Sequence, residues 1–223
     1  MNGFMLKIIA LICMAVDHVY KILPVQTILM EQFGMTLSGS SHVISAMALI
    51  GRISFPIFAF CIAQGCTYTK NINHYIIRLL CFGLISEVPF QLAFSGGIHL
   101  GIGSMFTNIF FTLALGAAAC KYYNLLIKKN VPRLLSMLPA LGCCLIAGFL
   151  NTDYSFWGVL FIFIPYVFAE KHVQLASLAI TLTVFYLGYK SYSSSLQLKF
   201  EWLEALSRGE ILPRAIIFWI GAM

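Results

Sequence analysis

Charged residues are scarce in this sequence. Only 10% of its 223 residues are Asp, Glu, Lys or Arg, whereas 60% are hydrophobic. Soluble domains carry about 25% charged residues, so the composition excludes an ordinary soluble domain and predicts an integral membrane protein. The net charge of +6 is spread over connections between apolar stretches. We therefore expect the basic residues to set topology and contact membrane lipid, and we expect no nucleic acid partner.

Regular spacing is missing from the seven cysteines. They lie in or beside apolar stretches, and Cys143 and Cys144 are adjacent. Because no pairs occur at metal-ligand spacing, we interpret them as small buried residues and predict no metal site. A cleavage site is missing as well: the N-terminal apolar stretch runs into Asp17 and His18. We expect that stretch to remain as the first membrane span.

Long apolar stretches are what the chain does have. A helix that crosses the bilayer needs about 20 apolar residues. The sequence predicts an all-α, polytopic transmembrane helix bundle of six to seven spans over residues 1–190, followed by a polar, amphipathic tail over residues 191–223 with a short hydrophobic segment at Ile211–Ala222. The expected spans are Phe4–Leu23, Val43–Thr69, Tyr75–Phe94, Met105–Tyr122, Leu134–Leu150, Phe156–Ala169 and Val173–Tyr189.

Basic residues occur in every second connection. Connections 24–42, 95–104 and 151–155 contain no Lys or Arg. The positive-inside rule therefore places the N-terminus in the cytoplasm and these three connections outside. The basic residues near helix ends, such as Lys21, Lys70 and Arg78, are expected to reach the membrane interface. The basic residues of the cytoplasmic connections are Lys7, Lys70, Arg78, Lys121, Lys128, Lys129, Arg133 and Lys171.

Several polar side chains interrupt the spans. A charge at the bilayer centre costs about 2.5–3.5 kcal/mol, so such residues face a protein interior and pair with one another. With the predicted topology, six polar residues fall in the outer half of the bilayer and indicate one pocket reached from outside: Asp17, His18, Arg52, Glu87, Asn108 and Asp153. Neighbours on a helix do not face each other. We therefore expect Asp17 to pair with Arg52, and His18 with Glu87, Asp153 or water; an Asp17–Arg52 clamp without chemistry is the structural alternative.

Ordered sequence blocks surround these polar residues: Leu6–Ala10 leading to Asp17-His18, Gly51–Phe60 with Gly65, Arg78–Leu80 leading to Ser86–Phe90, Asn108–Leu113 and Asp153–Leu160. These blocks resemble the TraX family, over roughly the first 170 residues. The resemblance implies a polytopic protein of the bacterial inner membrane related to pilin N-acetylation in conjugation. More distantly, the chain is similar to transmembrane acyltransferases, which use cytoplasmic acetyl-CoA to acetylate an acceptor across the membrane.

The implied chemistry gives the polar residues roles. Acyl transfer to an amine needs a proton acceptor, and His has a pKa suited to that task. We expect His18 to be the base, or the nucleophile that carries the acetyl group. Asp17 and Arg52 would hold the site together, and Arg52 would also stabilise negative charge on the thioester oxygen. Glu87 would orient His18 or the acceptor.

Two groups of residues complete the predicted site. Asn108 and Asp153 would bind the acceptor, which is a pilin amine, a lipid or a glycan amine. Lys128, Lys129 and Arg133 would attract the phosphates of acetyl-CoA on the cytoplasmic side.

The end of the chain departs from the family pattern. TraX proteins tend to continue with further apolar helices that contain a Tyr-Pro-His-type stretch, whereas residues 191–195 and 201–210 here are polar.

Two other functions fit the same residues. A secondary transporter would use the buried charges as an ion relay, but transporters often have two related halves; here the charges are concentrated in the first three spans. A noncatalytic assembly factor would use the spans to hold another apolar helix, such as a pilin precursor. The acceptor and the oligomeric state stay open.

Overall fold

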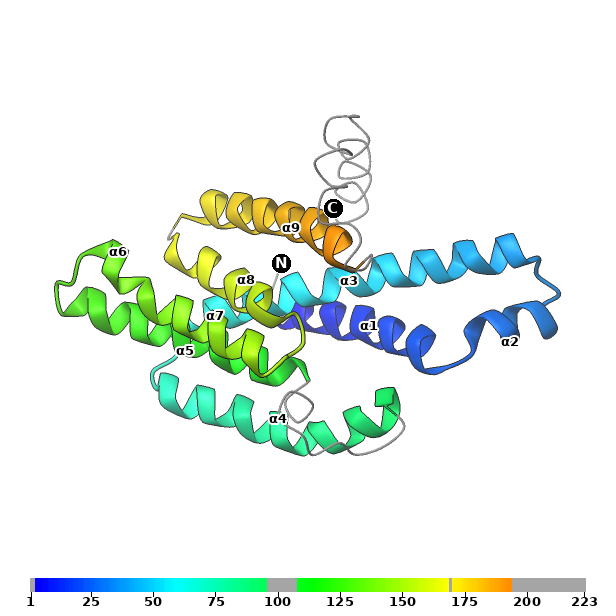
Figure 1. Ribbon diagram of the computed structural model, residues 1–223, viewed down its shortest axis with the longest axis horizontal. Helices are drawn as coiled ribbons and strands as arrows, with labels where there is room; N and C mark the ends of the chain where they lie inside the picture. The colour runs from blue at the N-terminus through cyan, green and yellow to red at the C-terminus, as the bar shows by residue number, and fades with distance from the viewer. Residues whose placement is uncertain (1–2, 96–107, 169, 194–223) are drawn as a thin grey trace. The chain divides into compact units, whose positions relative to one another are not determined.

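The computed structural model describes residues 3–95, 108–168 and 170–193. Every regular element in these ranges is an α-helix, which confirms the predicted all-α class. The helices are α1 (Gly3–Ile22), α2 (Val25–Glu31), α3 (Leu37–Tyr68), α4 (Ile72–Ser95), α5 (Ile109–Lys128), α6 (Arg133–Ser136), α7 (Leu138–Phe149), α8 (Ser155–Val167) and α9 (Lys171–Ser193) (Figure 1).

The long helices lie over the predicted spans, although α3 begins six residues earlier, at Leu37, and α5 ends six residues later, at Lys128. Four of the described helices, α1, α3, α4 and α5, are long and apolar enough to cross a membrane. Three shorter apolar stretches, at 133–149, 155–167 and 172–185, match the last three predicted spans. The chain is therefore a membrane protein. Its number of crossings and its division at residue 190 stay predictions, and most of the predicted C-terminal tail lies outside the described residues.

Two local features differ from the expected spans. The short helix α2 lies within the predicted connection 24–42. The expected span 134–150 is divided into α6 and α7 at Met137. Pro139 explains the division, because it has no N–H to donate to the i−4 carbonyl of Leu135 and is tolerated in the first turn of a helix such as α7.

The chain forms two compact units. Unit 1 comprises residues 1–57 and 179–223, and unit 2 comprises residues 58–178. In unit 1, α1 and the first part of α3 approach each other closely at Gly51. A Cβ atom at Gly51 would lie 2.4 Å from Asp17 Oδ1 and 2.5 Å from Asp17 Cβ. Only glycine permits this contact between the two helices.

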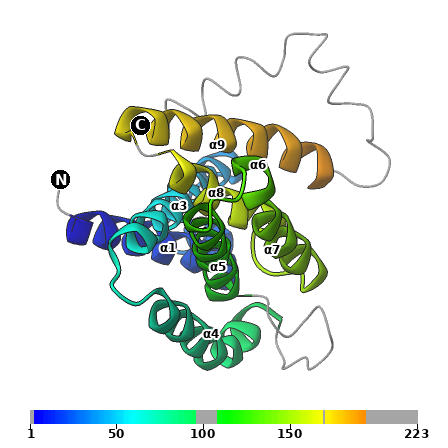
Figure 2. The same cartoon turned by 90° about the vertical axis from the view of Figure 1, so that its left-hand side faces the viewer.

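Unit 2 is built around α5, which packs against α4, α7 and α8 (Figure 2). The buried side of α5 consists largely of small residues, including Ala114, Gly116, Ala117 and Cys120. Small residues let helix backbones come close, as is common between membrane helices. At Gly116 an added Cβ would meet Ile162 of α8 at 2.4 Å.

Helix α4 has the residue distribution of a membrane helix. Ile85 is 72% exposed, whereas Glu87 is only 8% exposed and Gln91 is also buried. A helix in water would bury the isoleucine and expose the glutamate. The arrangement therefore fits a helix whose outer side contacts lipid and whose polar side chains face protein.

Asparagines end two helices of unit 2. Asn130 follows α5 and Asn151 follows α7, and both have positive φ angles, 59° and 53°. Their N–H groups donate to carbonyls three residues earlier, and the next residues donate to carbonyls five residues earlier. This is the Schellman motif, in which the residue with positive φ is usually Gly and sometimes Asn. The motif ends α5 and α7 and reverses the chain after each of them.

Two of the three acids of unit 2 lie apart from most of its basic residues. Glu87 and Asp153 lie near the end at which α5 begins, whereas Glu170 is exposed between α8 and α9. The opposite end holds the α3–α4 turn, the end of α5 and the start of α6. We call it the basic end, because it carries Lys70, Arg78, Lys128, Lys129 and Arg133.

Candidate functional site

A buried carboxylate lies at the centre of a hydrogen-bond network between α4 and α5. Gln91 lies one turn after Glu87 on α4, and its Nε2 donates to Glu87 Oε1 at 2.9 Å. Asn108 Nδ2 donates to Glu87 Oε2 at 2.6 Å, and the Asn108 backbone N–H donates to the same oxygen at 3.3 Å. Both carboxylate oxygens thus accept from amide donors, which offsets the cost of removing the group from water. We call Glu87, Gln91 and Asn108 the polar network.

Asn108 uses every polar atom of its side chain. Its Oδ1 accepts from the Phe110 N–H at 2.9 Å and caps α5. Its Nδ2 donates to Glu87 and also to the Gly83 carbonyl at 2.7 Å. An aspartate would keep the cap but lose both donors, so the position suits Asn specifically. The residue therefore ties the start of α5 to α4.

The turn before α8 is attached to the same helix α5. Thr112, one turn after Asn108, donates from its hydroxyl to the Asp153 carbonyl. Asp153 Oδ1 accepts from the Tyr154 N–H at 3.0 Å. Tyr154 and Ser155 have φ angles of 59° and 48°, a conformation that costs non-glycine residues about 1–3 kcal/mol and is found at functional sites.

His18 in unit 1 is held by its own helix. Its Nδ1 lies 2.8 Å from the Met14 carbonyl oxygen. A carbonyl only accepts, so Nδ1 carries the hydrogen. In the neutral imidazole the lone pair is then on Nε2. The helix geometry thus selects one tautomer.

The expected ion pair between Asp17 and Arg52 is wrong. The Asp17 carboxylate, 16% exposed, accepts instead from Lys21 Nζ at 2.5 Å. Lys21 follows by four residues on the same helix, which brings the two side chains onto one face. Arg52 is exposed and lies within electrostatic range of Tyr20, as do Asp17 and Lys21.

The predicted site residues therefore form two groups. Unit 2 brings together Glu87 and Asn108 in direct contact, with Asp153 bound to the same end of α5. Asp17, His18 and Arg52 belong to unit 1. Two expectations stay predictions: that all six residues form one pocket, and that His18 pairs with Glu87, Asp153 or water.

The residues expected to bind acetyl-CoA lie together at the basic end. Lys128 ends α5, Lys129 follows it and Arg133 begins α6; all three are exposed. Across the described ranges, no three His, Cys, Asp or Glu side chains gather as a metal site would require.

Sequence reasoning missed three partners of the predicted residues. Gln91 and Lys21 each follow an acid by four residues, a spacing that could have identified them. Thr112 could have been found only by its position one turn after Asn108. A fourth feature had no sequence signal: Gln64 Nε2 of α3 donates to Gln174 Oε1 of α9 at 3.0 Å within unit 2.

Comparisons with known proteins give one family and one relative. The family described as TraX protein matches residues 2–205. A protein of Dichelobacter nodosus described as "Probable fimbrial assembly protein FimC, serogroup H1" is 27% identical over 182 residues. The match covers 78% of this chain, which spans 65% of that relative's length. No solved structure matches the chain.

Proposed function

Because the chain belongs to the TraX family, we propose that it is a membrane-bound acyltransferase that transfers an acetyl group from acetyl-CoA to an acceptor amine. The proposed acceptor is a pilin N-terminus or another envelope component, in keeping with the name of the fimbrial assembly relative. The proposed location is the bacterial inner membrane, with the N-terminus and the basic end of unit 2 in the cytoplasm.

The observation that carries this proposal is the tautomer of His18. Its Nδ1–H is used by the Met14 carbonyl at 2.8 Å, which leaves the lone pair on Nε2. A histidine that served only to fill space would need no defined tautomer, whereas a base needs its lone pair at a fixed position. In its neutral form, this tautomer places the lone pair on Nε2, the atom to which we assign the proton abstraction.

The proposed step balances around His18. Its Nε2 takes a proton from the acceptor amine while the amine nitrogen forms a bond to the acetyl carbonyl carbon. The C–S bond of the thioester breaks, and His18 returns the proton to the leaving thiolate. In the nucleophilic alternative, Nε2 carries the acetyl group before the amine attacks.

Arg52 and Asp17 have distinct roles in this step. Among the described residues no carboxylate forms an ion pair with Arg52, so its guanidinium is suited to stabilise the negative charge that develops on the carbonyl oxygen. Asp17 pairs with Lys21 and positions the helix turn that carries His18.

The polar network of unit 2 supports a positioning role for Glu87. Amide donors occupy both of its oxygens, so it is better suited to fix α4 and α5 than to move protons. Asn108 belongs to the same network, and Asp153 would bind the acceptor from the adjacent turn.

The basic end fits the phosphates of acetyl-CoA. Its side chains are exposed ammonium and guanidinium groups, which pair well with phosphate oxygens. When bound, acetyl-CoA supplies the activated acyl group. Lys128, Lys129 and Arg133 are the residues first expected to hold it.

The test is acetyl transfer by the purified protein in liposomes, with acceptors identified by mass spectrometry of envelope components from cells with and without the chain. We expect His18→Ala to lower the rate about 10²–10⁴-fold at an unchanged unfolding temperature. His42→Ala, an exposed histidine of α3, is the matched control and should keep the rate. Normal acetylation by His18→Ala would refute the assignment.

A noncatalytic role in pilus assembly is the second candidate, favoured by the name of the relative. It predicts that His18→Gln leaves pilin maturation intact and that no component gains an acetyl mass.

A further inference from the structure

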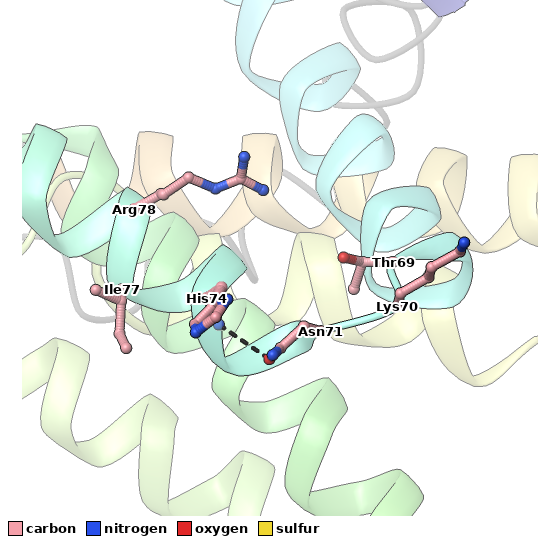
Figure 3. Close-up of a pocket in the computed structure, with 6 residues that line it drawn as sticks. All are labelled: Thr69, Lys70, Asn71, His74, Ile77 and Arg78. Carbon is pink, nitrogen blue, oxygen red and sulfur yellow. Dashed lines mark hydrogen bonds between the residues drawn. The ribbon is translucent and has the colours of Figure 1, made fainter.

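An open hollow of about 530 Å³ lies at the α3–α4 turn, at the basic end of unit 2 (Figure 3). Its volume is within the range of small-molecule sites. Arg78 extends from α4 on one side, Lys70 comes from the turn on the other, and Asn71 and His74 lie between them (Figure 3). The lining residues are Thr69, Lys70, Asn71, His74, Ile77 and Arg78.

The hollow has uncompensated positive charge. Lys70 and Arg78 are both exposed, and no carboxylate in the described part of the chain forms an ion pair with either. Of the three acids of unit 2, Glu87 and Asp153 are bound at its opposite end, and Glu170 is exposed between α8 and α9 and forms no ion pair among the described residues. The Arg78 guanidinium lies 5.9 Å from the centre of the Tyr75 ring, which holds this flexible side chain beside the hollow.

The start of α4 adds to the positive potential. Ile72 begins the helix, so its first turn, with its free backbone N–H groups, lies beside the lining residues Asn71 and His74. Asn71 Oδ1 accepts only one of them, from His74 at 3.3 Å. His74 itself is exposed and supplies a ring N–H donor. A lysine, an arginine, a histidine and a helix N-terminus around one hollow are the combination that binds phosphate groups.

We propose that this hollow binds the phosphate groups of a nucleotide, namely the phosphorylated adenosine end of CoA. The proposal rests on the proposed acyl transfer, and it gives Lys70 and Arg78 a binding role in addition to reaching the membrane interface. It also places the anchor of the donor on the α3–α4 turn, whereas Lys128, Lys129 and Arg133 attract the ligand from the neighbouring connection.

The position of the hollow on α4 supports this ligand. His74 and Glu87 are on the same helix, and a rise of 1.5 Å per residue separates them by about 20 Å. A ligand anchored at the hollow by its phosphates could therefore extend along α4 from the basic end toward the polar network. CoA has this shape, with its phosphates at one end and its thiol at the other.

The experiment measures binding of adenosine 3′,5′-bisphosphate to the full chain in nanodiscs of uncharged phosphatidylcholine. Lys70→Gln and Arg78→Gln should each weaken binding about tenfold, because each loses a charge-assisted hydrogen bond. Lys121→Gln removes the same charge from α5 outside the hollow and should change binding less than twofold. Unphosphorylated adenosine should not bind measurably.

A second arm distinguishes a lipid headgroup from the nucleotide. Nanodiscs with phosphatidylglycerol supply anionic lipid, and competition that abolishes bisphosphate binding would show that lipid occupies the hollow and would overturn the nucleotide assignment. Equal losses in all three variants would overturn the nucleotide assignment too, since they would reflect overall charge.

The binding site and the proposed enzyme activity can fail separately. Bisphosphate binding that depends on Lys70 and Arg78, without any acetyl transfer, would support the binding site but refute the acyltransferase function. Acetyl transfer with an unchanged KM for acetyl-CoA in both variants would support the acyltransferase function but refute the binding site.

Discussion

Units 1 and 2 each keep an acid within a membrane helix, but they hold it by different means. Asp17 is bound by Lys21 on its own helix, four residues away. Glu87 is bound by Gln91 on its own helix and also by Asn108, which is 21 residues away in sequence and begins the next long helix. The first arrangement exists wherever α1 is helical. The second exists only when α4 and α5 are packed together.

The difference indicates where function and stability are coupled. A local pair can be removed without disturbing other helices, so the region of α1 around His18 is free to serve chemistry. In the polar network, the single side chain of Asn108 caps α5, donates to the Glu87 carboxylate and donates to a backbone carbonyl of α4. We therefore expect substitutions in the network to act on folding and substitutions at His18 to act on rate.

The largest effect on stability is expected from Asn108→Ala. The substitution removes the cap of α5 and the side-chain amide donor that Asn108 gives to the buried Glu87 carboxylate and to the Gly83 carbonyl, at a cost of about 2–4 kcal/mol. The free energy of unfolding in mixed micelles measures it. Asn124→Ala, at an exposed position of the same helix, is the control and should change the value by less than about 0.5 kcal/mol.

Asn108→Asp sharpens this prediction. It keeps the capping oxygen but places a second carboxylate beside Glu87 and removes both donors, so the loss should be at least as large as for alanine. A neutral result would mean that the cap alone matters and that the network does not stabilise the fold.

A smaller effect is expected from Gly51→Ala in unit 1. The new Cβ would lie 2.5 Å from Asp17 Cβ, an atom fixed to the backbone, so α1 and α3 must move apart at a cost of about 1–3 kcal/mol. Gly116→Ala meets chiefly the Cδ1 end of the buried Ile162 side chain, whose Cβ is further away at 3.0 Å, and should cost less. At Gly142 nothing lies within 4 Å, so alanine there should be neutral or stabilising by up to about 1 kcal/mol. Equal values at the three glycines would contradict the close contact.

The smallest effect is expected from Lys21→Ala. Pairs four residues apart on a helix contribute about 0.3–0.5 kcal/mol when exposed, and Lys21 is 46% exposed. The same unfolding measurement applies, with Lys7→Ala on α1 as the control. A loss larger than that of Asn108→Ala would reverse the comparison between the two units.

Much of the helical structure could be predicted, because it depends on local composition. Apolar stretches of about 20 residues placed α1, α3, α4 and α5, and polar residues at one predicted depth identified Glu87 and Asn108 as neighbours. The error at Asp17 was avoidable, since Lys21 was available at the i+4 position. The division at Met137 was also readable from Pro139. In contrast, the Gln64–Gln174 hydrogen bond joins residues 110 apart, and no periodicity indicates such a contact.

The amino-acid sequence by itself determined that this chain is a helical membrane protein with basic residues in alternate connections, because hydropathy and charge act residue by residue in the bilayer. Only the tertiary structure decided that Glu87 accepts from Asn108 at the start of α5 and that Lys70, His74 and Arg78 line one hollow. These features depend on distances between side chains, which are set by how closely and in which register the helices pack.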